Sequence, residues 1–333
     1  MGGIVKTLNG GRFIFMLGVV LGALAMHSPA RAQFPGKPVL MVVPVGPGGG
    51  TDLLARQVAK KLSDAWGQTV VVENKTGGGG IIGAETVIKS APDGYTLLLS
   101  HDGVITATPL LYKRPDFDPA KQLAPITQLA TIPYLVVVHP SVQARNIPEL
   151  IALMKDKQAK KENFGFATSA PGSADHLSGE QFRLTAGVDM LVVPYKSTGP
   201  AMTDVIAGHL PMGFFSIPSA QPHVKAGRLR ALGITSSQRS KLLPDIQTVG
   251  ETLPGFATGA WYGLWTTAGT PSAIVEKISA DARRAVESTD LAAYMLNNGF
   301  DAATSTPAEF AEFIKRDSAK TAQVIKSANV RIE

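Results

Sequence analysis

Short apolar runs alternate with amphipathic stretches from residue 39 onward. The strand-like runs of the first part are residues 39–44, 69–73 and 95–100. Between them, apolar residues recur at about every fourth position in 51–66, as in an amphipathic helix, and 83–90 forms a shorter stretch of the same kind. This β-α-β-α-β order predicts a parallel sheet with helices on both faces.

The same alternation resumes in the middle of the chain. Its strand-like runs are residues 134–139, 163–167, 190–193, 212–215 and 229–235. Helices are expected between these runs, capped at their N-termini by Asn146 and Ser173, and a further one over 200–207. A second α/β unit is therefore predicted.

The last part of the chain has the pattern of helices. One is expected to begin at Pro271, another to cover 291–298, and Thr306 to Glu309 form a capping box with proline at the first helical position. Because few strand-like runs remain after residue 258, these helices should return to the first unit. The predicted lobes are 33–131 plus 259–333, and 132–258. Crossings near 129–135 and 258–266 would then form a hinge between them.

The N-terminus carries the pattern of a secretory signal peptide. Lys6 and Arg12 precede an apolar run at 13–26, which is short for a membrane span, and Ala30-Arg31-Ala32 has the small residues of a cleavage site. We expect residues 1–32 to be removed, so that the mature chain starts at Gln33. An uncleaved membrane anchor is the alternative.

Composition and charge narrow the function classes. The chain of 333 residues is 44% hydrophobic and 17% charged, as in a globular protein. It has no cysteine, so a disulfide, a catalytic thiolate and a lipid-modified cysteine are excluded, and a free exported protein suits a Gram-negative periplasm. The net charge of +6 becomes +3 without the three basic residues of 1–32. The basic residues are scattered, which does not favour nucleic-acid binding.

A glycine-rich segment at 45–52 is the first candidate site. Successive glycines allow backbone N–H groups to point into one concavity, and the N-terminus of the following helix adds partial positive charge. We therefore expect residues 45–52 to form an anion site. An ordinary loop, with Thr51 or Asp52 as the helix cap, is the alternative.

A second glycine-rich segment at 73–83 again joins a strand to a helix. Gly78, Gly80 and Gly83 match G-x-G-x-x-G, and Asp102 follows about twenty residues later, so a dinucleotide site stays open as an alternative. An exported protein has no access to the cytosolic nicotinamide pool, and a dinucleotide would leave the first loop unexplained. Two such loops at adjacent strand ends favour a shared cradle for one small anion.

The third segment, 167–176, is a strand end, a turn and a helix start in the second lobe. Its hydroxyl and N–H groups should face the cradle, because open α/β sheets bind ligands at the carboxyl ends of their strands. An exported hydrolase using Ser169 or Ser173 with His176 is the alternative, although no G-x-S-x-G elbow occurs. His101 follows a strand and is expected in the cleft. The histidines show no metal-binding spacing, so no metal or cofactor is expected.

Taken together and in this order, these motifs resemble the Bug family, the periplasmic receptors of tripartite tricarboxylate transporters. The stretches that carry the resemblance are residues 44–52, 55–56, 73–75, 91–97, 172–173, 176–177, 194–196, 199–201, 227–232, 243–245 and 261–264, with Glu180 and Asp204. They extend over nearly all of the mature chain. Two departures bear on ligand preference: Val45-Gly46 in the first loop, and Thr76-Gly77-Gly78 in the second.

The resemblance implies an α/β, two-lobe type II periplasmic-binding-protein (Venus flytrap) fold with a ligand cleft between the lobes. It implies a monomeric receptor, not an enzyme, which binds a small carboxylate (a dicarboxylate, an amino acid or an aromatic acid) and delivers it to membrane permease subunits. The implied first-lobe contacts are Gly48, Gly49, Gly50, Thr51, Asp52, Thr76, Gly79, Gly80, Ile82, Ser100 and His101. Those of the second lobe are Thr168, Ser169, Ser173, His176, Tyr195 and Ser216. The family's ligands are varied, so the resemblance does not identify one.

Overall fold

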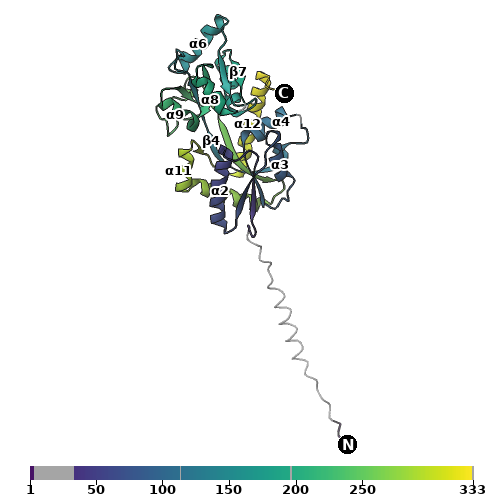
Figure 1. Ribbon diagram of the computed structural model, residues 1–333. Helices are drawn as coiled ribbons and strands as arrows, with labels where there is room; N and C mark the ends of the chain where they lie inside the picture. Colours follow the sequence, from purple (N-terminus) through teal and green to yellow (C-terminus); the bar gives the residue numbers. More distant parts are fainter. Residues whose placement is uncertain (4–33, 113, 196, 332–333) are drawn as a thin grey trace. The chain divides into compact units, whose positions relative to one another are not determined.

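The computed structural model describes residues 1–3, 34–112, 114–195 and 197–331. It divides the chain into a short N-terminal unit, Met1–Gly36, and a compact body, Lys37–Glu333, which carries the helices and strands named below (Figure 1). The expected signal peptide falls almost entirely outside the described residues. Within the described part of the chain, no helix combines the length and apolar character needed to cross a membrane.

The first sheet has six strands in the order β11-β4-β10-β3-β1-β2. They are β1 (Val39–Val43), β2 (Val70–Asn74), β3 (Thr96–His101), β4 (Leu123–Ile132), β10 (Ala260–Thr267) and β11 (Asp301–Ala302). Strands β2, β1 and β3 run parallel, whereas β10 pairs antiparallel with both β3 and β4. The predicted β-α-β-α-β unit is therefore present, but the sheet is mixed and not wholly parallel as expected.

The second sheet has five strands in the order β7-β6-β8-β5-β9. They are β5 (Tyr134–Val138), β6 (Gly165–Thr168), β7 (Leu191–Pro194), β8 (Met212–Ser216) and β9 (Arg230–Ile234). Here β5 pairs antiparallel with β8 and β9. Each sheet thus has three parallel strands, then an antiparallel strand that comes directly from a crossing (β10 or β5), and then a strand antiparallel to that one (β4 or β9). The two sheets share this topology, and the first has β11 in addition.

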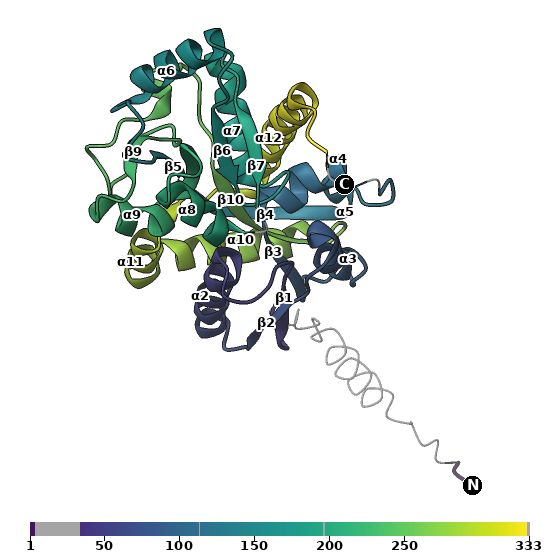
Figure 2. The same cartoon turned by 45° about the horizontal axis from the view of Figure 1, so that its top comes forward.

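The helices are distributed between the two sheets along the chain (Figure 2). Those associated with the first sheet are α2 (Gly50–Trp66), α3 (Ile81–Ile88), α4 (Thr108–Leu111), α5 (Pro119–Gln122), α10 (Ser272–Glu287), α11 (Thr289–Asn297) and α12 (Pro307–Ala328), with short turns η1 (Gly78–Gly80) and η2 (Gly103–Ala107). Those that follow the second sheet's strands are α6 (Ile147–Ala159), α7 (Ala174–Ala186), α8 (Thr198–Ile206) and α9 (Ile217–Lys225), with η3 (Val249–Glu251). Several caps match the sequence: Asn146 accepts from the Glu149 amide, and Thr306 forms a capping box with Glu309.

Alternation along β5 divides the core of the second sheet between two faces. Val136 and Val138 pack into one apolar cluster with α6 and α7, and Leu135 and Val137 pack into another with α8 and α9. In the first sheet, α3, η2 and α12 share one cluster that includes Phe310, while α2 and α10 pack against each other. The C-terminal helix α12 also packs against α7 of the second sheet.

Strand β10 was not predicted, and its burial explains why. All eight of its residues are buried, so no alternation marks it as a strand. Trp261 and Trp265 pack against Phe310 of α12 in the core of the first sheet. Strand β4 and helix α9, which carries an internal proline, were also missed.

The two connections between the sheets lie against each other. On the outward path only Pro133 separates β4 from β5. On the return path Gly259 has φ +153°, and a Cβ atom there would lie 2.6 Å from the Ile132 carbonyl oxygen, which a side chain would not tolerate. Thr235 bonds to both paths, since its hydroxyl accepts from the Tyr134 amide and donates to the Thr258 carbonyl.

Candidate ligand-binding site

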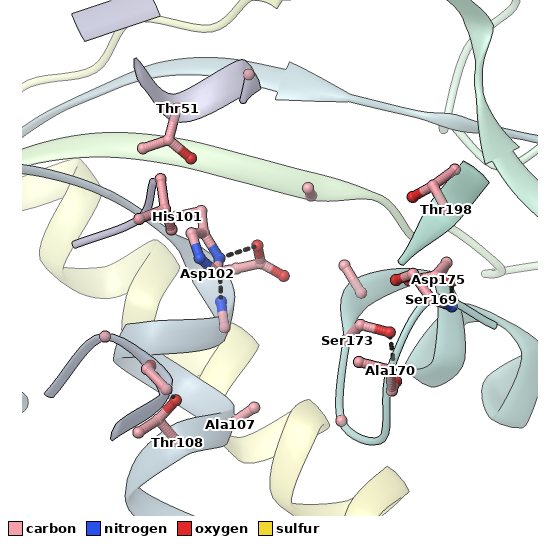
Figure 3. Close-up of a pocket in the computed structure, with 18 of the residues that line it drawn as sticks. Thr51, His101, Asp102, Ala107, Thr108, Ser169, Ala170, Ser173, Asp175 and Thr198 are labelled. Carbon is pink, nitrogen blue, oxygen red and sulfur yellow. Dashed lines mark hydrogen bonds and ion pairs between the residues drawn. The ribbon is translucent and has the colours of Figure 1, made fainter. Parts of the chain in front are cut away.

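A cavity of about 670 Å³ lies among the carboxyl ends of strands from both sheets. The loops after β1, β2 and β3 line it from one side, and the loops after β6, β7 and β8 line it from the other (Figure 3). This is the position at which open α/β sheets bind ligands, and the volume suits a small organic molecule.

The second glycine loop forms one wall of the cavity and is possible only with glycine. Gly77, Gly78, Gly79 and Gly80 all have positive φ. A Cβ atom on Gly80 would lie 2.4 Å from the Val104 side chain. The loop leads through η1 into α3. The amides of Gly80 and Ile82 donate to the Gly77 carbonyl, whereas the Gly79 amide has no partner among the bonds described and belongs to the cavity wall.

The first glycine loop ends where α2 begins. The first intrahelical bond runs from the Leu53 amide to the Gly49 carbonyl, so the amides of Gly50 and Thr51 have no partner within the helix. Both of these residues line the cavity. A second helix N-terminus therefore offers donors to the same space as the second glycine loop.

Asp52 braces the first loop and does not line the cavity. Its carboxylate accepts from the Gly48 amide at 2.9 Å, from Asn74 Nδ2 at 2.9 Å and from Arg56 Nε at 3.0 Å. Burial opposes its ionisation, but the bonds from Arg56, Gly48 and Asn74 outweigh burial and hold the pKa of Asp52 below its usual range. Asp52, which was predicted to contact the ligand, thus lies outside the cavity lining and supports the loop.

Asp175 plays the same part in the facing loop of the second lobe. Its carboxylate accepts from the Ser169 amide at 2.6 Å, from the Ser169 hydroxyl at 2.7 Å and from the Thr168 hydroxyl at 3.1 Å. These bonds hold the turn after β6 in place, and Ser169 and Asp175 both line the cavity (Figure 3).

His176 and Ser173 each form a hydrogen bond with a different backbone group. The Gly172 amide donates to His176 Nδ1 at 2.8 Å, and the Ser173 hydroxyl donates to the Ala170 carbonyl at 2.6 Å. Burial lowers the pKa of His176, so its ring is neutral at pH 7. Ser173 is the backbone cap of α7 without a capping side-chain bond. Neither Ser169 nor Ser173 shares a hydrogen bond with His176 among the bonds described, so the nucleophile–base contact of a hydrolase is not present.

The charged residues that line the cavity are acidic. Asp102 and Asp175 belong to the lining, whereas no lysine or arginine does among the residues described. Tyr134 and Tyr262 also line it, and burial, with smaller contributions from nearby acids, raises the pKa of both hydroxyls. Among the lining residues that the structure describes, the donors offered to an anionic ligand group are therefore neutral ones, backbone amides and hydroxyls.

The structure separates the predicted contacts into two groups. Those that line the cavity are Gly50, Thr51, Gly79, Gly80, His101, Ser169, Ser173 and Ser216. Those outside the lining are Gly48, Gly49, Asp52, Thr76, Ile82, Ser100, Thr168, His176 and Tyr195. Three residues of the second group are turned away from the cavity or engaged elsewhere. Ile82 is 54% exposed, and Ser100 is fully buried in β3. The Tyr195 hydroxyl donates to Asp204.

Other lining residues were not among the predicted ligand contacts. They include Asp102, Thr108, Tyr112, Tyr134, Thr198 and Tyr262. Asp102 comes directly after β3, and its position at a strand end is a signal that could have identified it. Tyr262 lies in the unrecognised strand β10, and Thr108 and Tyr112 lie on and just after α4, where no sequence pattern marks them.

Two α/β lobes of one topology, with a cavity at their strand ends, define a two-lobe solute-binding protein. A family model described as "Tripartite tricarboxylate transporter family receptor" matches residues 54–330, and the chain belongs to this family. This match confirms the resemblance seen in the sequence. Members of the family are binding receptors and not enzymes. Protein BugT of Bordetella pertussis is 32% identical over 329 residues, covering 98% of this chain and all of BugT.

Solved structures agree with this assignment and with the predicted fold class. One described as R. palustris Rpa4515 with adipate has a TM-score of 0.75 and 29% identity, over 90% of this chain and 99% of that one. The periplasmic binding protein BugD has a TM-score of 0.72 and 33% identity, over 90% of this chain and all of BugD. The two-lobe type II binding-protein fold expected from the sequence is therefore confirmed.

Proposed function

We propose that this protein is a periplasmic receptor that binds one small carboxylate in the cavity between its lobes and delivers it to membrane permease subunits. The observation that carries the proposal is the convergence of two glycine-built helix N-termini, those of α2 and α3, on a single cavity. The adipate in the related R. palustris structure supports a carboxylate as the ligand class. The expected secretory signal peptide and the periplasmic BugD support the location.

The proposed carboxylate is held by hydrogen bonds and not by an ion pair. Gly50, Thr51 and Gly79 offer backbone donors from the first lobe, and Ser169 and Ser173 lie across the cavity. Each hydrogen bond to a charged group contributes about 1.5–3 kcal/mol. Closure of the second lobe would strengthen these bonds by excluding water.

Thermal unfolding of the mature protein with a panel of small carboxylates tests the proposal. At a hundredfold excess over its Kd, a ligand stabilises the folded state by about 2.7 kcal/mol, which raises Tm by roughly 4 °C in a mature chain of about 300 residues. Amides and alcohols with the same carbon skeletons serve as comparison compounds. A panel in which no carboxylate raises Tm, or in which the neutral compounds do so equally, contradicts the proposal.

Two glycine variants locate the site. Gly80→Ala places a Cβ atom against Val104 in the cavity wall, whereas Gly227→Ala has the same positive-φ strain in open space, away from the cavity. The Tm rise with the carboxylate should be lost in Gly80→Ala and kept in Gly227→Ala. Uptake of the same acid into vesicles that carry the permease should require added receptor.

A further inference from the structure

The cavity offers both hydrogen-bond donors and an acidic acceptor. The glycine loops and the N-terminus of α2 provide N–H donors from the first lobe. Asp102, which follows β3 in the same lobe, provides a carboxylate oxygen, Oδ1, without a hydrogen-bond partner in the described part of the chain. It is only 7% exposed, and its Oδ1 atom is fully buried and has no hydrogen-bond partner among the described residues. In Figure 3 its carboxylate points away from its own lobe, toward the loop that carries Ser173.

The neighbouring histidine does not satisfy this carboxylate. His101 Nδ1 lies 3.6 Å from Asp102 Oδ1, but the same nitrogen accepts a hydrogen bond from the Gly103 amide at 3.1 Å. A neutral ring that accepts at Nδ1 has no hydrogen there to donate. Asp102 Oδ1 therefore faces a second acceptor and not a donor.

The nearby cation is also engaged elsewhere. Lys320 shares a smaller neighbouring cavity with Asp102, but its ammonium group donates to the Ala257 carbonyl at 2.5 Å. On the far side of the main cavity, the Asp175 carboxylate is occupied by Ser169 and Thr168. A buried carboxylate without a donor is costly in the ligand-free protein, so a donor is expected to arrive with the ligand.

We propose that the ligand is a small carboxylate that also carries a protonated amine, and that Asp102 accepts a hydrogen bond from that amine. This rests on the function proposed above. The carboxylate of such a zwitterion meets the glycine-loop donors and its ammonium group meets Asp102. A plain dicarboxylate would instead bring a second negative charge into a cavity that already holds Asp102 and Asp175 and is lined by no described lysine or arginine.

Matched ligand pairs test this inference by isothermal titration calorimetry on ligand-free mature protein. The pairs are acids that differ by one amine: glutarate with glutamate, adipate with 2-aminoadipate, and pentanoate with 5-aminopentanoate. We expect the tightest ligand to be an amine-bearing acid, about ten- to a hundredfold tighter than its partner without the amine, as a charge-assisted hydrogen bond provides. Equal or tighter binding of the acids without an amine overturns the inference but leaves the carboxylate receptor intact. Binding of none of them contradicts both proposals.

The variant Asp102→Asn tests whether Asp102 discriminates between acids with and without the amine. The variant should bind the amine-bearing acid about ten- to a hundredfold more weakly, while the partner without the amine binds as well as before or better. Asp64→Asn, which removes the same charge from an exposed position on α2, should change neither affinity. Asp102→Ala provides a second variant, and thermal unfolding of each ligand-free variant checks that it is folded. An unchanged affinity ratio in a folded Asp102 variant overturns the proposed role.

Discussion

Replacement of Asp52 by asparagine tests whether the first glycine loop is held in place from behind. The side chain is buried and collects donors from Gly48, Asn74 and Arg56, which belong to the loop, to β2 and to α2 itself. Asparagine preserves the size of the side chain but removes the charge and one acceptor oxygen. Its amide group would also face a donor, since the Gly48 and Asn74 groups both point toward the carboxylate.

The expected loss follows from these contacts. Arg56 is half exposed, so its ion pair contributes little after solvent screening. The bonds from Gly48 and Asn74 to the buried charge contribute about 1.5–3 kcal/mol each, and asparagine can replace part of one. We expect Asp52→Asn to lower the free energy of unfolding by about 2–4 kcal/mol, which corresponds to a Tm lower by roughly 3–6 °C.

The stabilisation that Asp52 provides should decrease at low pH. Because the pKa of Asp52 is lower in the folded protein than in the unfolded chain, its stabilisation is fully present above about pH 4. It is lost as the pH falls through the folded pKa. The Tm difference between the wild-type protein and Asp52→Asn should therefore be constant from pH 5 to 7 and shrink below about pH 4.

The assay is thermal and urea unfolding of the wild type, Asp52→Asn, Asn74→Ala and the double variant. The two side chains share a 2.9 Å bond, so the double variant should lose less stability than the sum of the two single losses, by roughly 1 kcal/mol. A single-variant Tm within a degree or two of the wild type, or strictly additive losses, would refute the role of Asp52 as a brace.

Three further changes probe the hinge and the C-terminal helix. Gly259→Ala should lower stability by about 1–3 kcal/mol, measured by urea unfolding, because its Cβ atom would collide with the Ile132 carbonyl. Trp261→Phe removes the 2.8 Å donor to the half-buried Asp317 and should cost about 1–3 kcal/mol at pH 7. Since burial raises the pKa of Asp317, that cost should decrease as the pH is lowered through it and the carboxyl becomes neutral. Thr306→Ala removes the capping box of α12 and should lower the free energy of unfolding by about 1 kcal/mol, detectable as a small fall in Tm.

The sequence predicts elements well where one face is buried and poorly where both are. Helix α2 shows its period of nearly four because one side faces solvent, and its end at Gly67 follows from the left-handed conformation of that residue. Strand β10 has no polar face, so the pattern rules that identify β2 cannot identify it. Its central place in the first sheet depends on pairing with β3 and β4, which are far from it along the chain.

The site shows a similar division. Glycine-rich segments after strands predict the location of the cavity walls, and Gly50, Thr51, Gly79 and Gly80 do line it. Sequence alone cannot tell which residues of a loop face inward. Asp52 is adjacent to Thr51, yet a single helical step of about 100° turns its side chain toward Asn74 and away from the cavity.

Three aspartates near strand ends show why some carboxylates brace a loop while another is available to a ligand. Asp52, Asp102 and Asp175 are all buried and all belong to the turns or helix starts that follow a strand. Asp52 and Asp175 each receive at least one amide of their own loop, so their charge is used within the protein. Asp102 receives none at Oδ1. The residue type, the burial and the topological position are alike, so the number of donors that the fold supplies is what leaves one carboxylate available to a ligand. That number depends on the path of the surrounding backbone. The sequence can therefore place Asp102 at a strand end, but only the three-dimensional structure shows that one of its carboxylate oxygens lacks a donor among the residues described.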